Sequence, residues 1–429
     1  MTIFRGTVLD TPDGTAPGGI RLRSETDAAL VVVDGRITAR GPFAETLRAH
    51  PGHDVVDLRG GLILPGLVDT HVHYPQVRVI GALGLPLLQW LDEWALPEEA
   101  RLESTDYARA VAEEFVRGLV SAGTTTALVF GSHFAAAVDV LFETAARSGL
   151  RVTAGLVASD RSLPEPLLTT PDRFYDESTA LAERWHGVGR TRYAVTPRFS
   201  YSASDEMLDA CASVLKDVDG AWFTSHVNEN VAEVTAVAQL FAAAEHYVGT
   251  YDRHGLLGSR AVLAHNVHAT DPELDLLAGR GASVSHCPTS NASLGSGMFP
   301  MRRHVGQGVR IALGSDVGAG TGFSMLKEAL QAYLVQQLLG PDGLPLTAPD
   351  LLHLATRSGA LALGLDDVGD LGVGKQFDAI WVRPAVGLPL DVGLRHAASP
   401  EDALAKTIAL GGPADIAAVW VGGDRLTPP

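Results

Sequence analysis

The chain has 429 residues, 46% of them hydrophobic and 19% charged, which is typical of a globular protein with a large core and room for a second, smaller domain. Its formal net charge of -17 disfavours nucleic acid as a partner, because two polyanions repel each other. No stretch approaches the about 18 apolar residues that a membrane span needs, and the N-terminal MTIFRGTVLD does not have the pattern of a secretion signal. Two cysteines cannot form a disulfide framework. We therefore expect a cytoplasmic protein without a membrane partner.

The first 64 residues have the pattern of short β-strands joined by turns. Runs of Val, Ile and Thr are bounded by Gly, Pro and Asp in ALVVVDGRITARGP and HDVVDLRGGLILPG, as in β-hairpins. The end of the chain, with QFDAIWVRP and IAAVWVGGDRL, has a similar pattern. Because each end is too short to form a core alone, we predict that residues 1–64 and 369–429 together form one small β-sandwich domain.

Residues 65–368 repeat a different pattern, in which an apolar run ends in polar residues and is followed by a helical stretch. The helical stretches, such as AAAVDVLFETAARSG and DPELDLLAGRG, end in glycine, as many helices do. Runs that are apolar throughout are typical of strands buried on both faces. Eight such units predict a (β/α)8 barrel, an α/β fold of the TIM type, with the strands GLILPGLVDTHVH, TTTALVFGSH, RVTAGLVASD, RYAVTPRFS, AWFTSHVNEN, RAVLAHNVHAT, ASVSHCPTSN and VRIALGSDVG.

A polar cluster closes each predicted strand, and the active sites of such barrels lie at the carboxyl ends of the strands. The clusters are, in chain order, His71 and His73, His133, Asp160, Arg198, His226 and Glu229, His265 and His268, His286 and Asn291, and Asp316. In the first cluster, VDTHVHYPQ, two histidines stand one residue apart. Residues i and i+2 of a strand face the same side, about 6.6 Å apart along the chain, so both imidazoles can reach one ion.

Three of these histidines and one aspartate have the chemistry of a catalytic zinc site. Imidazole nitrogens and carboxylate oxygens suit a divalent metal, and zinc lowers the pKa of bound water toward about 7. His71, His73 and His226 would supply nitrogens from the first and fifth strands. Asp316, after the eighth strand, would supply an oxygen, and His265 is placed to contact the water rather than the metal.

Each of these residues alone also fits a structural role. A single strand-end histidine is more often a hydrogen-bonding residue than a ligand, and two alternate histidines can lie on a surface strand. Asp316 in GSDVG could belong to a turn or cap a helix. Their joint placement at the ends of strands one, five, six and eight favours the metal site.

Glu229 lies three residues after His226 in HVNEN, so it can reach a substrate beside the metal. A glutamate that shuttles protons without binding the metal is what hydrolytic deamination of an aromatic base requires. The alternative interpretation is a glutamate at the start of the helix VAEVTAVAQL, where a negative charge is favourable. The two interpretations are compatible.

Several longer motifs narrow the family. They are PGLVDTHVHYPQ, VTPRFS, HVNEN, AHNVH, CPTSNASLGSG and ALGSDVGAGTGFSML, and they extend over most of the predicted barrel. With these motifs the chain resembles the guanine deaminases of the amidohydrolase superfamily. PGLVDTHVH alone marks only the superfamily, whereas HVHYPQ together with TPRF and GSDVGAGTGFSML is much more specific.

The resemblance implies a cofactor and a set of site residues. It implies one zinc ion per subunit, a free guanine base as the small-molecule substrate, and a homodimer. The metal ligands would be His71, His73, His226 and Asp316. The purine pocket would be lined by Gln76, Arg198 and Phe199, together with Glu229 and Asp316 as the proton-transfer pair.

Lysine usage separates this chain from binuclear relatives. Many members of the superfamily bridge two metals with a carboxylated lysine from a strand in the middle of the barrel. This chain has no lysine before Lys216, which itself lies in the helical stretch before the fifth strand. We therefore expect a mononuclear site.

Guanine fits the predicted pocket because its O6 and N7 are both hydrogen-bond acceptors, whereas adenine shows an acceptor and a donor there. Arg198 only donates, so it favours guanine, and a buried mismatch with adenine costs about 1–3 kcal/mol. Gln76 can donate and accept, and Phe199 offers a face for stacking. The mechanism that we expect has water attack C2, with Glu229 and Asp316 transferring protons and His265 orienting the nucleophile.

Two alternatives remain at this point. The same chemistry could act on 8-oxoguanine, a pterin, cytosine or a chlorinated triazine. The barrel could also be a metal-free scaffold that binds other proteins, although all four ligand positions are occupied by residues that bind metal.

Overall fold

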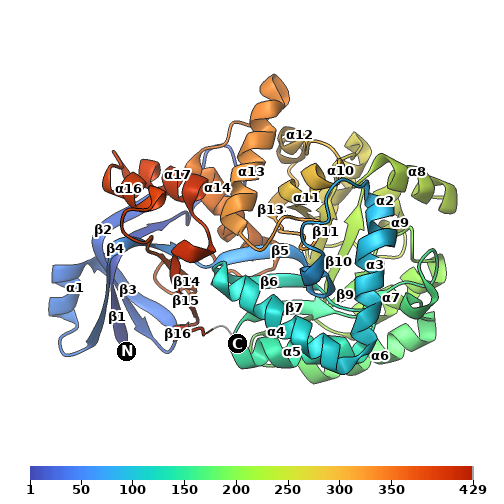
Figure 1. The fold of residues 1–429 in the computed structure, drawn as a ribbon, viewed down its shortest axis with the longest axis horizontal. Helices are drawn as coiled ribbons and strands as arrows, with labels where there is room; N and C mark the ends of the chain where they lie inside the picture. Colours follow the sequence, from blue (N-terminus) through green and yellow to red (C-terminus); the bar gives the residue numbers. More distant parts are fainter. Residues whose placement is uncertain (428–429) are drawn as a thin grey trace.

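The computed structural model describes residues 1–427 and shows a small sheet beside a larger barrel (Figure 1). The sheet contains both ends of the chain, drawn in blue and red, and the barrel contains the segment between them. This arrangement confirms the predicted combination of a (β/α)8 barrel with a small β domain. Within residues 1–427, every helix is too short or too polar to cross a lipid bilayer.

The small domain is a single mixed sheet of seven strands over the described residues, in the order β16-β15-β14-β4-β1-β2-β3. Its strands are β1 (Thr2–Asp10), β2 (Arg23–Val33), β3 (Arg36–Pro42), β4 (Asp54–Pro65), β14 (Ala379–Val382), β15 (Ile416–Val421) and β16 (Asp424–Arg425). The two ends of the chain join where β14 pairs antiparallel with β4, with Ile380 opposite Leu64. Three short helices accompany this sheet: α1 (Phe43–Ala49), α16 (Pro389–Arg395) and α17 (Pro400–Leu410).

Aromatic side chains from both ends of the chain pack in the core of the small sheet. The ring of Phe4 stacks on that of Phe377 at 4.2 Å between centroids, and Trp420 lies edge-on to Phe4 at 5.5 Å. All three side chains are buried. Neither end could bury these rings alone, which is the physical reason why both ends contribute to one domain.

The barrel has eight parallel strands in its main path over the described residues, one for each apolar run in the sequence. The strands are β5 (Leu67–His73), β6 (Thr124–Phe130), β7 (Arg151–Gly155), β9 (Thr191–Pro197), β10 (Trp222–Val227), β11 (Ala261–His265), β12 (Ser283–His286) and β13 (Arg310–Leu313). A short extra strand, β8 (Val157–Ala158), pairs with β9. Every residue of β5 and β6 is buried, as expected for strands covered on both faces.

Helices cover the outside of the barrel (Figure 1). They are α4 (Thr105–Ser121), α5 (Ala135–Ser148), α6 (Pro171–Trp185), α7 (Asp205–Asp217), α8 (Val231–Leu240), α9 (Tyr247–Asp252), α10 (Asp271–Arg280), α11 (Pro288–Ser293), α12 (Met301–Gly306), α13 (Met325–Leu338), α14 (Ala348–Ala355) and α15 (Arg357–Ala362). Their ends follow ordinary rules: Ser204 caps α7 by accepting from the Met207 N–H, and Gly149 ends α5 in a left-handed conformation (φ 79°).

The barrel closes where the loop after β13 meets β5. The Asp316 N–H donates to the His71 carbonyl at 2.9 Å, and the His73 N–H donates to the Val317 carbonyl at 3.0 Å. These two bonds place Asp316 beside the two histidines of β5, although 243 positions separate Asp316 from His73. The predicted metal ligands of strands one and eight are therefore brought together by barrel closure.

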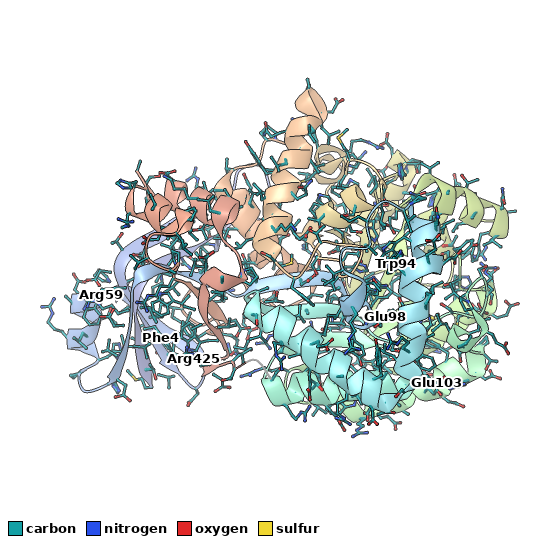
Figure 2. All side chains as sticks on the ribbon, in the orientation of Figure 1. Phe4, Arg59, Trp94, Glu98, Glu103 and Arg425 are labelled. Carbon is teal, nitrogen blue, oxygen red and sulfur yellow. The ribbon has the colours of Figure 1, made fainter. Side chains whose placement is uncertain are left out.

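The segment between β5 and α4 forms an irregular helical layer over the mouth of the barrel. It runs through η1 (Tyr74–Val79), α2 (Leu87–Trp90), the π-helical turn η2 (Leu91–Ala95), α3 (Leu96–Ala100) and η3 (Arg101–Glu103). Figure 2 labels Trp94, Glu98 and Glu103 along this segment. We call residues 87–100 the cover helix, because its buried face lies against the pocket described below.

Candidate active site

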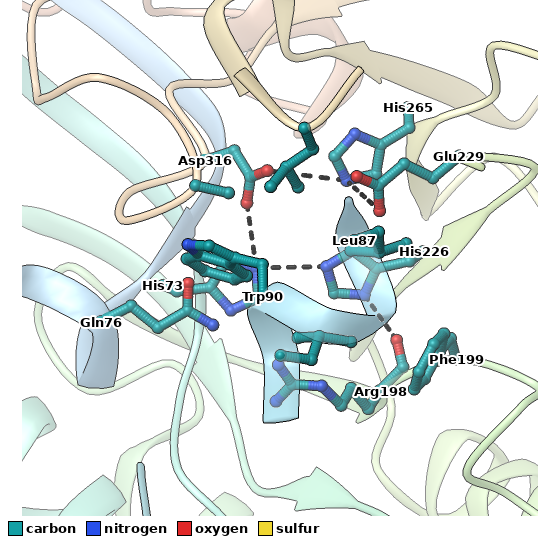
Figure 3. Close-up of a pocket in the computed structure, with 13 residues that line it drawn as sticks. His73, Gln76, Leu87, Trp90, Arg198, Phe199, His226, Glu229, His265 and Asp316 are labelled. Atoms are coloured by element: carbon teal, nitrogen blue, oxygen red, sulfur yellow. Dashed lines mark hydrogen bonds and ion pairs between the residues drawn. The ribbon is translucent and has the colours of Figure 1, made fainter. Parts of the chain in front are cut away.

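Four side chains from three parts of the barrel meet at the carboxyl ends of the strands, and Figure 3 shows three of them, His73, His226 and Asp316. The Nε2 atom of His73 lies 3.2 Å from that of His71 and 3.1 Å from that of His226. The Oδ1 atom of Asp316 lies 3.1 Å from His73 Nε2 and 3.3 Å from His71 Nε2. All four side chains are buried.

The distances between these atoms match those between the ligands of a zinc ion. A network of hydrogen bonds explains them less well. Zinc bonds of about 2.0–2.1 Å place tetrahedral ligands about 3.3 Å from one another. His73 Nε2 carries at most one proton, yet two imidazole nitrogens and one carboxylate oxygen surround it. A shared cation satisfies all these lone pairs at once.

His265 belongs to the margin of the same cluster. Together with His71, His226 and Asp316 it forms a second possible ligand set, whose atoms lie within 4.8 Å of one another. We favour His73 over His265 as a ligand, because His265 Nε2 is 3.7 Å from Asp316 Oδ2 whereas the His73 contacts are 3.1–3.2 Å. His265 remains near enough to touch a water molecule bound there.

Hydrogen bonds on the far side of two imidazoles fix their orientation. The Nδ1–H of His226 donates to the Arg198 carbonyl at 2.6 Å, and the Nδ1–H of His265 donates to Asn291 Oδ1 at 2.9 Å. A histidine whose Nδ1–H is held in this way can present a lone pair on Nε2 toward the cluster. This is the tautomer that metal binding or proton acceptance requires.

The protonation states of the cluster also suit a cation. Burial lowers the pKa of His71 to about 3 and that of His226 well below its ordinary value, so both rings are neutral at pH 7. Burial opposes the ionised form of Asp316, but hydrogen bonds to His71 and His73 outweigh it and hold its pKa well below the ordinary value. The neutral imidazoles of His71 and His226 thus face one carboxylate.

The environment of Glu229, beside the cluster, has the opposite effect on its pKa. Burial, and then the negative charges of Asp316 and Glu233, raise the pKa well above the ordinary value and so favour the protonated form. Its Oε2 atom is 3.4 Å from His265 Nε2, and its Oε1 atom accepts from the Ser296 hydroxyl at 3.3 Å. A neutral carboxyl group at this place can donate a proton to a substrate.

The loop HVNEN places Glu229 before helix α8 rather than in it. Asn230 is the N-cap of α8, and the glutamate of the first turn is Glu233. Glu233 Oε2 accepts the backbone N–H of Glu229 at 3.0 Å, which holds Glu229 in position. The sequence-based alternative of a first-turn glutamate therefore applies to Glu233 and was wrong for Glu229.

Three site residues adopt left-handed backbone conformations, which are uncommon outside glycine. The φ angles are 49° at Asn228, 69° at His265 and 49° at Asp316. Such conformations cost on the order of 1–3 kcal/mol each and are concentrated at functional sites. Here they turn the chain at the ends of strands, just where the side chains of His265 and Asp316 meet.

A pocket opens beside the cluster. Its polar side contains His73, Gln76, Arg198, His226, Glu229, His265 and Asp316. Its apolar side contains Leu87, Trp90, Leu91, Phe199, Leu294 and Ala319. A pocket with an apolar side and convergent polar groups suits a small heteroaromatic molecule.

The structure thus brings together every residue that the sequence placed in the site, with His71 behind the pocket wall. Sequence reasoning missed Glu99, a buried carboxylate on the cover helix. The Nη1–H of Arg198 donates to Glu99 Oε2 at 2.6 Å, and the Nε2–H of Gln76 donates to Glu99 Oε1 at 2.7 Å. No motif marks Glu99, because its partners lie 23 and 99 positions away.

Comparison with known proteins gives consistent similarities over the whole chain. Residues 62–426 match the amidohydrolase family. A probable guanine deaminase of Deinococcus radiodurans is 56% identical over 429 residues, which cover 99% of this chain and 98% of that protein.

Two solved structures are also similar. An E. coli guanine deaminase superposes with a TM-score of 0.96 at 37% identity and covers 100% of both chains. A guanine deaminase from C. acetobutylicum with guanine bound in its active site has a TM-score of 0.91 at 27% identity, covering 99% of this chain and 100% of that one.

Proposed function

The chain belongs to the guanine deaminases of the amidohydrolase family, and on that premise we propose that its site hydrolyses guanine to xanthine and ammonia with one zinc ion per subunit. The observation that carries the proposal is the contact of three imidazole nitrogens and a carboxylate beside a pocket with one polar and one apolar side. The guanine bound in the C. acetobutylicum enzyme supports the choice of substrate.

The residues present fit a zinc ion. Neutral histidines and an ionised aspartate are the ligands that zinc accepts in hydrolases, and the expected ligands are His71, His73, His226 and Asp316. When bound, zinc would lower the pKa of a water molecule toward about 7 and so make a nucleophile available at neutral pH. The remaining chemistry belongs to the side chains of the chain itself.

Binding of guanine would use both sides of the pocket. Arg198 and Gln76 present N–H groups to a ring edge on which guanine has the acceptors O6 and N7. Phe199 and Trp90 offer aromatic faces on the apolar side, where a flat ring gains stacking energy. The pocket therefore orients a purine before the reaction begins.

Proton transfer would be divided between two carboxyl groups. Glu229, whose raised pKa favours the protonated form, donates its proton to N3 as water attacks C2, so that the ring does not carry negative charge. Asp316 takes a proton from the attacking water, and His265 accepts a hydrogen bond that orients it. That proton then passes to the exocyclic amino group, which leaves as ammonia, while the new C2 hydroxyl returns its remaining proton to Glu229 and becomes the C2 carbonyl of xanthine.

The experiment that tests this function follows xanthine and ammonia during incubation of the purified protein with guanine, before and after chelation. We expect equimolar xanthine and ammonia, loss of both on chelation, and recovery on addition of zinc. A panel with adenine, 8-oxoguanine, a pterin, cytosine and a triazine fixes the substrate. Zinc-loaded protein that releases no ammonia from guanine would contradict the proposal.

We also propose that the protein works as a cytoplasmic homodimer. Helix α13 supports this proposal, because it carries leucines on an outward face: Leu334 is 42% exposed and Leu338 is 74% exposed. Exposed apolar side chains at i and i+4 on one helix are typical of a surface that a second chain covers.

A further inference from the structure

Glu99 is a buried carboxylate that takes no part in the reaction described above. It lies on the cover helix, is 2% exposed, and accepts hydrogen bonds from both Gln76 and Arg198. These two partners are the polar groups expected to read the substrate edge. A single carboxylate therefore holds two recognition groups that come from different strand ends of the barrel.

The contact with Glu99 fixes which end of the Gln76 amide donates. The Oε1 atom of Gln76 accepts the Gly318 N–H at 3.0 Å, while its Nε2–H donates to Glu99. A flipped amide would set an NH2 group against an N–H and an oxygen against a carboxylate, which are two repulsive contacts. Gln76 therefore keeps its second Nε2–H for the pocket, and its ability to accept, noted from the sequence, is used by Gly318.

Arg198 is held in the same way. Its guanidinium group has five N–H donors and no acceptor, and one donor is used by Glu99. The positive charges of Arg198 and His133 outweigh the effect of burial and lower the pKa of Glu99 to about 2, so Glu99 only accepts hydrogen bonds. Both recognition groups are thus anchored by an acceptor and show N–H groups to the pocket.

We propose that Glu99 is a positioning residue that determines specificity, because by anchoring Gln76 and Arg198 together it makes one wall of the pocket donate only. This inference rests on the proposed function. Such a wall recognises purines with two neighbouring acceptors, the 6-oxo group and N7. It rejects 6-amino purines, whose amino hydrogens would face buried donors without a partner.

The variant Glu99→Gln tests this role with two substrates that share the 2-amino leaving group. Guanine has an oxygen at C6, and 2,6-diaminopurine has an amino group there. An amide at position 99 has one oxygen and one NH2, so it can no longer accept from both partners, and one recognition group is freed to turn. We expect kcat/KM for guanine to fall about 10- to 100-fold. We call kcat/KM for guanine divided by kcat/KM for 2,6-diaminopurine the substrate ratio, and we expect it to fall at least about 10-fold.

Glu98→Gln is the matched control on the same helix. Glu98 is nearly as buried as Glu99 (8% exposed), but it bonds to the Tyr107 hydroxyl and to Arg101. Glu98→Gln therefore alters the same helix, but the hydrogen bonds that it changes do not involve Gln76 or Arg198. We expect Glu98→Gln to keep the wild-type substrate ratio.

Glu99→Asp is a second variant that tests the same role if Glu99→Gln does not fold. It keeps a negative charge near Arg198 but is one methylene shorter, so it cannot reach both partners, and the substrate ratio should fall here as well. Zinc content and melting temperature are measured for each variant. A wild-type ratio in a folded variant, or failure of both variants to fold, would assign Glu99 a purely structural role and overturn the inference. Wild-type protein inactive on guanine would instead contradict the proposed function.

Discussion

At the scale of single residues, Glu229 carries the most direct chemical prediction. Its buried carboxyl group, whose pKa is raised well above the ordinary value, lies next to the expected metal ligands but outside that set. Glu229→Gln should therefore keep one zinc ion per chain and lower kcat for guanine by a factor of about 10² to 10⁴, because an amide cannot transfer the proton. Steady-state kinetics with metal analysis on the same sample measure both quantities. Near-normal turnover would remove Glu229 from this role.

Glu99 gives a prediction for pH dependence. Its pKa is lowered to about 2 in the folded protein, so its ionised form is stabilised relative to the unfolded chain, where its ordinary value is 4.5. Its contribution to stability is therefore complete well above pH 4.5 and is lost as pH falls from there toward 2.

The measurement compares the free energies of unfolding of wild type and Glu99→Gln in urea from pH 7 to pH 3. We expect wild type to be about 3–5 kcal/mol more stable at pH 7, because the variant leaves the Arg198 charge buried without its carboxylate. This advantage should shrink below pH 4.5. A difference that stays constant down to pH 3 would show that the carboxylate does not titrate as its environment implies.

The sequence allowed residues to be assigned to the site where the topology of the barrel constrains their position. His71, His73, His226 and Asp316 were identifiable because parallel barrel strands bring their carboxyl ends together. Glu99 was not identifiable, because it follows a π-helical turn whose course depends on packing against the finished barrel. Glu229 was singled out by its spacing after His226, but its position before α8 rather than in the first turn was not predictable until the N-cap, Asn230, was known.

At the scale of elements, two tryptophans of the cover helix allow the contribution of the apolar pocket wall to stability and to guanine binding to be measured. Trp90 is 2% exposed and lines the pocket, whereas Trp94, one turn later on the same helix, is 48% exposed. Trp90→Ala should lower the free energy of unfolding by about 3–5 kcal/mol and raise KM for guanine, because it removes core packing and a pocket wall together. Trp94→Ala should change stability by less than about 0.5 kcal/mol.

Urea unfolding and steady-state kinetics on the two tryptophan variants check this contrast. Equal effects of the two substitutions would contradict the placement of the cover helix over the pocket.

The eight strands of the barrel were predictable from the sequence, because each is an apolar run closed by polar residues. The course of residues 74–104 was not, because its short helical pieces lack a regular period and are stabilised by contacts with the pocket walls.

At the scale of the whole molecule, the two chain ends were predictable as one β domain because neither has enough apolar residues for a core. The single mixed sheet, with β4 between β1 and β14, depends on pairings across more than 300 positions that no local pattern encodes. The boundaries at residues 64/65 and 368/369 stay predictions. They are compatible with β4, which ends at Pro65, and with β5, which begins at Leu67.

The proposed homodimer leads to a prediction for α13. Leu338→Glu places a charge on the exposed leucine face and should shift the protein from dimer to monomer in analytical ultracentrifugation. Val386→Glu is the control, because Val386 is 92% exposed but lies in the loop between β14 and α16. Wild-type protein that sediments as a monomer, or a dimer insensitive to Leu338→Glu, would contradict this interface.

The most direct test of the central claim is a titration of zinc into chelator-treated protein, with guanine-dependent xanthine formation measured at each step. The four closely spaced ligand atoms predict a rate that rises linearly and stops rising at one zinc ion per chain. Turnover of guanine by the metal-free protein, or a break at two ions per chain, would contradict the account of a single zinc site.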